Sequence, residues 1–130
     1  MGIRSKSRPL RLLLRAYFTL VSADLLLSSG GLPAVYRSVR QHATKQRHAE
    51  AEETICEAMD IACAFYFKQV LCLQRAAATT ILLRQYGVPA EMVIGTQLCP
   101  FRAHAWVEVA GRVANDKPYT ADLYRVLDRC

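Results

Sequence analysis

Apolar residues recur three and four positions apart over most of the first 86 residues, the spacing of amphipathic helices. The first predicted helix spans 9–27 and begins at Pro9, a residue suited to a first helical turn. The Ser/Gly/Pro-containing stretch 28–33 interrupts this pattern, which then resumes over 33–46. A third helix is predicted over 49–67. The first half of the chain is therefore predicted to be helical.

A nearly continuous apolar run begins at Cys72 and predicts a helix that is buried on most sides. Gly87 follows it at the usual position of a C-terminal cap, and Pro89 lies beyond. The preceding stretch, 65–71, contains no Gly, Pro, Ser or Asp that would mark a helix start. A break before Cys72 is inferred from its expected function.

The last third of the chain reads as strands, predicted over 90–96, 103–109 and 112–117. A short helix or irregular segment over 120–127 is expected to close the chain. Helices followed by an antiparallel sheet define an α+β fold, in which N-terminal helices precede a buried helix packed on a small sheet.

Positive charge is concentrated in the N-terminal third. The net charge is +6, and residues 1–48 hold nine Lys or Arg and two His against a single acid, Asp24. We expect a basic helical region, 1–48, packed on or docking to a core formed by 49–130. Such a surface suits an acidic partner: a peptide, a protein, nucleic acid or anionic lipid.

The segment 10–27 is the one candidate for a membrane or targeting segment, since it follows a basic stretch. Arg11, Arg15 and Asp24 interrupt it, and each would be costly in hydrocarbon. We interpret it as a buried or amphipathic helix rather than a membrane span.

The cysteines indicate reduced thiols. There are five, with no CxxC pair, and the three His residues show no zinc-ligand spacing, so no metal or cofactor is expected. An odd count without a recognisable secretory signal favours the cytoplasm. Cys56 and Cys63 fall on an apolar helical stripe and are expected in the core.

Cys72, His104 and Asp116 are the candidate catalytic residues. Each alone has an ordinary interpretation: a core thiol, a structural imidazole and a turn-forming acid. Together, on a helix and two strands, they suit acyl transfer, in which an imidazole activates the thiol and an acid orients the imidazole.

The length of the last hairpin loop decides whether His104 and Asp116 meet. A two-residue loop would place them on opposite faces of the sheet. A three-residue loop, 109–111, puts glycine at its left-handed position, pairs Glu108 with Arg112 and sets His104 opposite Asp116. We predict the three-residue loop, with Cys72 lying over the face that carries His104.

Three further residues are candidates for substrate contacts. Gln69 could donate to an oxyanion, although a solvated loop glutamine is the ordinary alternative. Phe101 lies in the loop 96–102, just before His104, where Cys99 is interpreted as incidental. Trp106 shares a strand face with His104 and would either wall the site or serve as a core residue.

Five short segments over about residues 50–127 resemble the transglutaminase-like branch of papain-type folds, and within it the B2 leader peptidases of lasso peptide biosynthesis. They are Cys72-Leu-Gln-Arg-Ala, Leu82-Leu-Arg-Gln-Tyr-Gly87, Ile94-Gly95, Pro100-Phe-Arg-Ala-His-Ala-Trp-Val-Glu108 and Asn115-Asp116. The Pro-Phe-x-Ala-His-Ala-Trp-Val-Glu string is the most specific of them.

The resemblance implies Cys72 as nucleophile, His104 as base and acid, and Asp116 as the residue that orients His104. It also implies removal of a leader peptide from a ribosomally made precursor, before macrolactam closure. The implied partners are the precursor, a separate B1-type leader-recognition protein and, as a further candidate, the ATP-dependent macrolactam synthetase; nucleic acid is not expected. The residues leave two alternatives open: acyl transfer to an amine, and a non-catalytic binding module.

Overall fold

The computed structural model describes residues 7–45, 51–98 and 101–130. The elements, in chain order, are α1 (Ser7–Gln41), α2 (Glu52–Ala64), α3 (Cys72–Gln85), β1 (Ala90–Gln97), β2 (Arg102–Val109), β3 (Arg112–Val113), α4 (Thr120–Leu123) and β4 (Arg125–Arg129). The predicted α+β class, with helices followed by a small antiparallel sheet, is confirmed.

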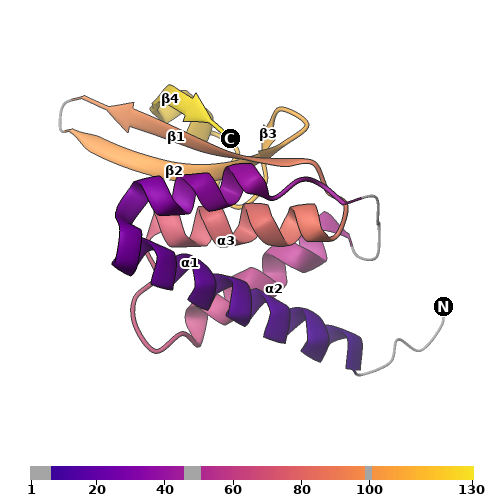
Figure 1. Ribbon diagram of the computed structural model, residues 1–130. Coiled ribbons are helices and arrows are strands. Elements are labelled where there is room, and N and C mark those ends of the chain that lie inside the picture. The colour runs from indigo at the N-terminus through magenta and orange to yellow at the C-terminus, as the bar shows by residue number, and fades with distance from the viewer. Residues whose placement is uncertain (1–6, 46–50, 99–100) are drawn as a thin grey trace.

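The molecule has a helical layer beneath a single sheet (Figure 1). The described strands form a four-stranded sheet in the order β3-β2-β1-β4, with every neighbouring pair antiparallel. α3 packs on β1 and β2; α2 and the first part of α1 lie below α3, and the last part of α1 runs beside α3 just beneath the sheet (Figure 1). β3 and β4 lie at opposite edges, so the chain between them must cross the sheet.

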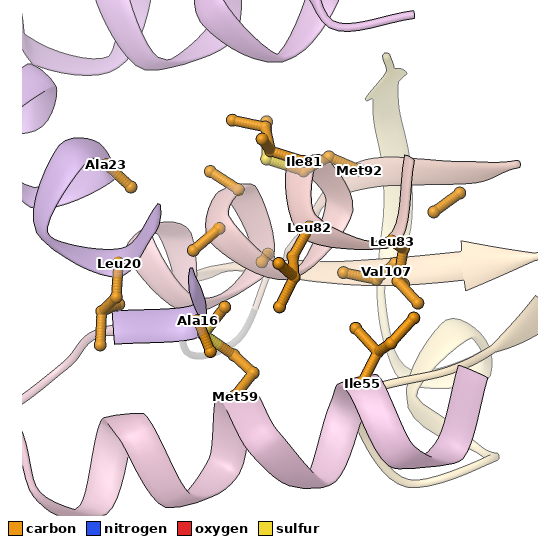
Figure 2. Close-up of a cluster of buried hydrophobic side chains, with 14 of the residues drawn as sticks. Ala16, Leu20, Ala23, Ile55, Met59, Ile81, Leu82, Leu83, Met92 and Val107 are labelled. Atoms are coloured by element: carbon orange, nitrogen blue, oxygen red, sulfur yellow. The ribbon is translucent and has the colours of Figure 1, made fainter. Parts of the chain in front are cut away.

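The core lies between the sheet and the helices (Figure 2). α3 is at its centre, as its apolar character predicts, and Leu82 is fully buried. Leu20 comes from α1, Met59 from α2 and Val107 from β2. α1 therefore shares one core with the elements that follow it.

α1 consists of two helical arms joined at Gly31 (Figure 1). The backbone of Gly31 has φ 68° and ψ −163°, a left-handed region that favours glycine. The predicted interruption in 28–33 is therefore confirmed. The second arm ends at Gln41 rather than 46: residues 42–45 are not helical, and Gln46 lies outside the described residues.

The last hairpin differs from the prediction. Val109 pairs with Arg112, so the loop contains two residues, Ala110 and Gly111, both with positive φ. The charges that favoured the other register have different partners: Arg112 binds Glu52 of α2 and Glu108 binds Arg129 of β4. β3 is also shorter than predicted, because its pairing with β2 ends at Val113.

The C-terminal segment contains a strand where a helix or irregular segment was predicted. Only the single turn of α4 is helical, and β4 then pairs with β1 across an irregularity between Ile94 and Gly95. The sequence of β4, Arg-Val-Leu-Asp-Arg, does not alternate apolar and polar residues, and all five side chains are exposed. It is therefore held by backbone pairing to β1 rather than by a buried face.

Two narrower expectations concern the membrane and the thiols. No helix in the described part of the chain is long and apolar enough to span a membrane.

Cys56 and Cys63 pack against the core as predicted, and burial raises the pKa of the Cys56 thiol to about 11.

Candidate functional site

His104 and Asp116 meet on the sheet face opposite the helices. The distance between His104 Nε2 and Asp116 Oδ2 is 2.7 Å, a short hydrogen bond typical of a charged acceptor. On β2, Ala105 and Val107 point to the helical core, so the alternation of the strand directs His104 to the other face. The chain that leaves β3 crosses this same face on its way to β4 and brings Asp116 with it.

The pair forms although the predicted register is wrong. If the strand pairing set by the two-residue loop continued, it would direct Asp116 to the face that packs on the helices. Regular pairing ends before that residue. Ala114 still donates its N–H to Val107 O at 2.8 Å, and the Asn115 side chain then accepts the N–H of Val107, also at 2.8 Å. A side-chain bond thus replaces the strand ladder and releases Asp116 to turn toward His104.

The carboxylate of Asp116 is held in its charged form. Burial by itself would raise its pKa, but hydrogen bonds from His104 and the Lys117 N–H, together with the charges of His104 and Arg75, lower the pKa below its ordinary value. An ionised acid beside Nε2 stabilises an imidazolium and fixes the orientation of the ring. Since Nε2 binds Asp116, Nδ1 is the nitrogen left free for other chemistry.

Two aromatic side chains pack against His104. The ring of Tyr124 lies 5.2 Å from that of His104, and the ring of Trp106 lies 6.0 Å from it, both nearly parallel. Trp106 is fully buried and donates from Nε1 to Glu108 Oε2 at 2.8 Å. Trp106 therefore lies beneath the imidazole as packing, and no face of it is open to a substrate.

Cys72 lies at the end of the sheet where His104 is found. Only four residues separate α3 from β1, so the helix runs back along the strand and its first residue lies near the β1–β2 hairpin (Figure 1). Cys72 is the first residue of α3, where backbone N–H groups are unpaired and the helix dipole favours negative charge. The helix start that the local sequence left unmarked is thus at the position inferred for it.

The expectation that α3 covers the face carrying His104 is wrong. α3 packs on the opposite face, which carries Ala105 and Val107. Within the described residues Cys72 makes no side-chain hydrogen bond to His104. The charge of Arg75, one turn after Cys72, nevertheless lowers the pKa of Asp116.

The remaining candidates lie on loops at this end of the molecule. Gln69 is exposed in the segment before α3, and Phe101 is 71% exposed at the tip of the β1–β2 hairpin. Phe65 and Phe67 add exposed aromatic surface in the first of these loops. Cys99 lies outside the described residues.

Sequence reasoning missed a buried acid behind the start of α3. Asp24 is 4% exposed and binds Tyr66 and Gln74. Its isolation as the single acid among 48 residues was the available signal, together with a Gln at the third position of α3, where capping residues are favoured. In the part of the chain that the structure describes, no group of three or more His, Cys, Asp or Glu is arranged to hold a metal ion.

The fold and the paired His and Asp define a class. The family model described as the transglutaminase-like superfamily matches residues 17–129 of the sequence. Because that match covers most of the chain, the chain belongs to the transglutaminase-like superfamily. The match begins within α1, in agreement with a core to which α1 contributes.

A particular relative agrees with the more specific resemblance. Over 56 residues the chain is 39% identical to the microcin J25-processing protein McjB of Escherichia coli. The aligned stretch covers 43% of this chain and 27% of that protein, so the chain matches little more than a quarter of the length of this curated relative. No solved structure matches the chain. The similarity supports the resemblance to B2-type proteins drawn from the sequence.

Proposed function

We propose that this chain is a cysteine endopeptidase that removes the leader peptide from a ribosomally synthesised lasso peptide precursor before macrolactam closure. The observation that carries the proposal is the 2.7 Å hydrogen bond between His104 and Asp116, in a chain whose Cys72 begins a buried helix. The processing role named for the McjB relative supports the substrate class.

Each proposed role follows from position. The Cys72 thiolate attacks the carbonyl carbon of the scissile peptide bond, and the unpaired N–H groups of the first turn of α3 face the oxyanion that forms. His104, held through Nε2 by Asp116, takes the proton of the Cys72 thiol on Nδ1 as the thiolate forms, and gives that proton to the leaving amine as the peptide C–N bond breaks. It then accepts a proton from water, which attacks the acyl-enzyme, releases the leader and restores the thiol.

Loops at the start of α3 and at the hairpin tip suit a peptide substrate. Phe65, Phe67 and Phe101 are more than two-thirds exposed, and clusters of exposed apolar side chains mark binding surfaces. We assign these two loops to the residues on either side of the scissile bond, with Gln69 as a further contact.

A B1-type partner would present the leader. The outer face of α1 carries the exposed side chains of Arg11 and Arg15 beside Leu14 and Phe18, a combination that suits an acidic and partly apolar partner surface. We assign the partner to this face, with the macrolactam synthetase as a further candidate partner. The odd number of cysteines and the proposed catalytic thiol favour a reducing compartment, and we assign the protein to the cytoplasm.

The proposal is tested by reconstituting the reaction with a precursor and a leader-recognition protein from the same gene neighbourhood, and identifying the products by mass. Cys72→Ala is expected to abolish release of the leader, while Cys63→Ala, at a core thiol, retains it. Cleavage by Cys72→Ala would overturn the proposal. A Cys72-dependent product that carries an added primary amine would instead identify an acyl transferase.

A further inference from the structure

Asp24 is a buried carboxylate surrounded by donors from the segment that precedes Cys72. It lies on the first arm of α1 and is 4% exposed. Oδ2 accepts the hydroxyl of Tyr66 at 2.8 Å, and the ammonium of Lys68 lies 3.0 Å from Oδ1. Both partners belong to the loop between α2 and α3, so this one acid holds the loop at two points.

A third donor extends the contact to the start of α3. Gln74 Nε2 donates to Asp24 Oδ1 at 2.9 Å, and the same amide accepts the backbone N–H of Leu71 at 2.9 Å. Leu71 is the N-cap residue and has no side-chain acceptor, so it supplies no cap of its own. The cap comes instead from Gln74, whose orientation depends on Asp24.

The chemistry of the three donors requires a carboxylate. Tyr66, Gln74 and Lys68 all present hydrogens, and an ionised Asp accepts from each without offering one. Burial would raise the pKa of Asp24, but the bonds from these three donors lower it below its ordinary value. An amide at this position would turn its own N–H₂ toward at least one donor.

We propose that Asp24 is the positioning residue for Cys72: through Gln74 and the 65–71 loop it sets the residue at which α3 begins, and so the place of the thiol. Its effect on turnover rests on the proposed function, whereas its effect on the helix start does not. The local sequence before Cys72 carries no start signal because the signal is supplied across 50 residues of chain.

The first arm of the test is hydrogen exchange by NMR, which needs no substrate. In Asp24→Asn the amides of Leu71 and Arg75 are expected to exchange roughly tenfold faster relative to the amides of α2, because the cap is lost. Val39→Ala, a buried change in the other arm of α1, is the matched control and is expected to alter exchange evenly. Should Asp24→Asn fail to fold, Gln74→Met breaks the same link and leaves Lys68 and Tyr66 bound to Asp24.

The second arm measures leader cleavage. Asp24→Asn is expected to lower kcat by roughly 10²-fold and leave KM within about twofold, since a displaced nucleophile slows chemistry without weakening substrate binding. Asp24→Asn combined with Gln74→Glu exchanges the acid and the amide, restores an acceptor for the Leu71 N–H and is expected to recover part of kcat.

The outcomes separate the two proposals. If the amides of Leu71 and Arg75 in Asp24→Asn exchange no faster than those of α2, relative to the wild type, the positioning role is overturned. An unchanged kcat in the folded variant would also overturn it. A wild-type protein that cleaves no leader would overturn the proposed function, and the exchange at Leu71 would still decide whether Asp24 sets the helix start.

Discussion

The hydrogen bond between His104 and Asp116 joins a strand residue to the connection that crosses the sheet, and not to a neighbouring strand. The position of Asp116 is therefore set by bonds just beside it: Asn115 binds Val107, and the Lys117 N–H donates to Asp116 Oδ1 at 2.8 Å. These local bonds replace a strand register as the means of aligning the pair.

Asp116→Asn is expected to lower kcat for leader cleavage by about 10²–10⁴-fold. The amide has the shape of the acid but neither stabilises an imidazolium nor favours the same ring tautomer. Steady-state cleavage of the precursor, measured by mass spectrometry, gives kcat.

Asp122→Asn is the matched control, because Asp122 is an exposed acid on the same crossing segment. It is expected to leave the rate unchanged. A rate for Asp116→Asn within a few-fold of the wild type would remove Asp116 from the proposed mechanism.

Asn115→Ala is expected to destabilise the fold by about 1–3 kcal/mol, since it leaves the Val107 N–H without its acceptor. It is also expected to reduce cleavage, because Asp116 loses the adjacent bond that directs it toward His104. Denaturant unfolding measures the first effect and initial rates of cleavage measure the second. Asn115→Asp keeps an acceptor oxygen and is expected to retain most of the stability and most of the cleavage rate. Equal losses in the Ala and Asp variants would contradict the role given to this bond.

The helices could be predicted because their signals are local. The apolar spacing that predicts α2 and α3 repeats every three or four residues. The kink in α1 is set by Gly31 itself. The start at Cys72 was inferred from function more than from local signals. In the structure Gln74 accepts the N–H of Leu71 and donates to Asp24, which is far away in the chain.

The His104–Asp116 contact was expected from the sequence, but by a register that the structure replaces. The choice of register relied on pairing Glu108 with Arg112. In the fold these two charges bind β4 and α2, partners that no local pattern reveals. β4 itself escaped prediction because an exposed edge strand carries no alternation of apolar and polar residues.

Glu108 is expected to make stability depend on pH in the acid range. Burial would raise its pKa, but hydrogen bonds from Arg129 and Trp106 lower it below the ordinary value of 4.5. A folded pKa below the unfolded one contributes stability above about pH 4.5, and that contribution is lost as the pH falls through the folded pKa. Urea unfolding at a series of pH values, for the wild type and Glu108→Gln, measures this contribution.

Because Asp24 and Asp116 also have lowered pKa values, the informative quantity is the difference between the two proteins. The wild type is expected to be the more stable at pH 7, and the difference is expected to shrink below pH 4.5. A difference that stays constant down to pH 3 would show that Glu108 titrates alike in the folded and unfolded states.

Gly95→Ala is expected to destabilise the protein by about 1–3 kcal/mol through overpacking beneath His104. Gly95 pairs with His104 across the strands, and an added Cβ would lie 2.7 Å and 2.9 Å from two Trp106 ring atoms and 2.9 Å from Tyr124 Cβ. Thermal unfolding measures the loss. Trp106→Phe removes the ring atoms that clash, so in a double-mutant cycle the two changes together should cost less than the sum of each alone. Additive costs would mean that the strain comes from the backbone of β1 and not from the packing under the imidazole.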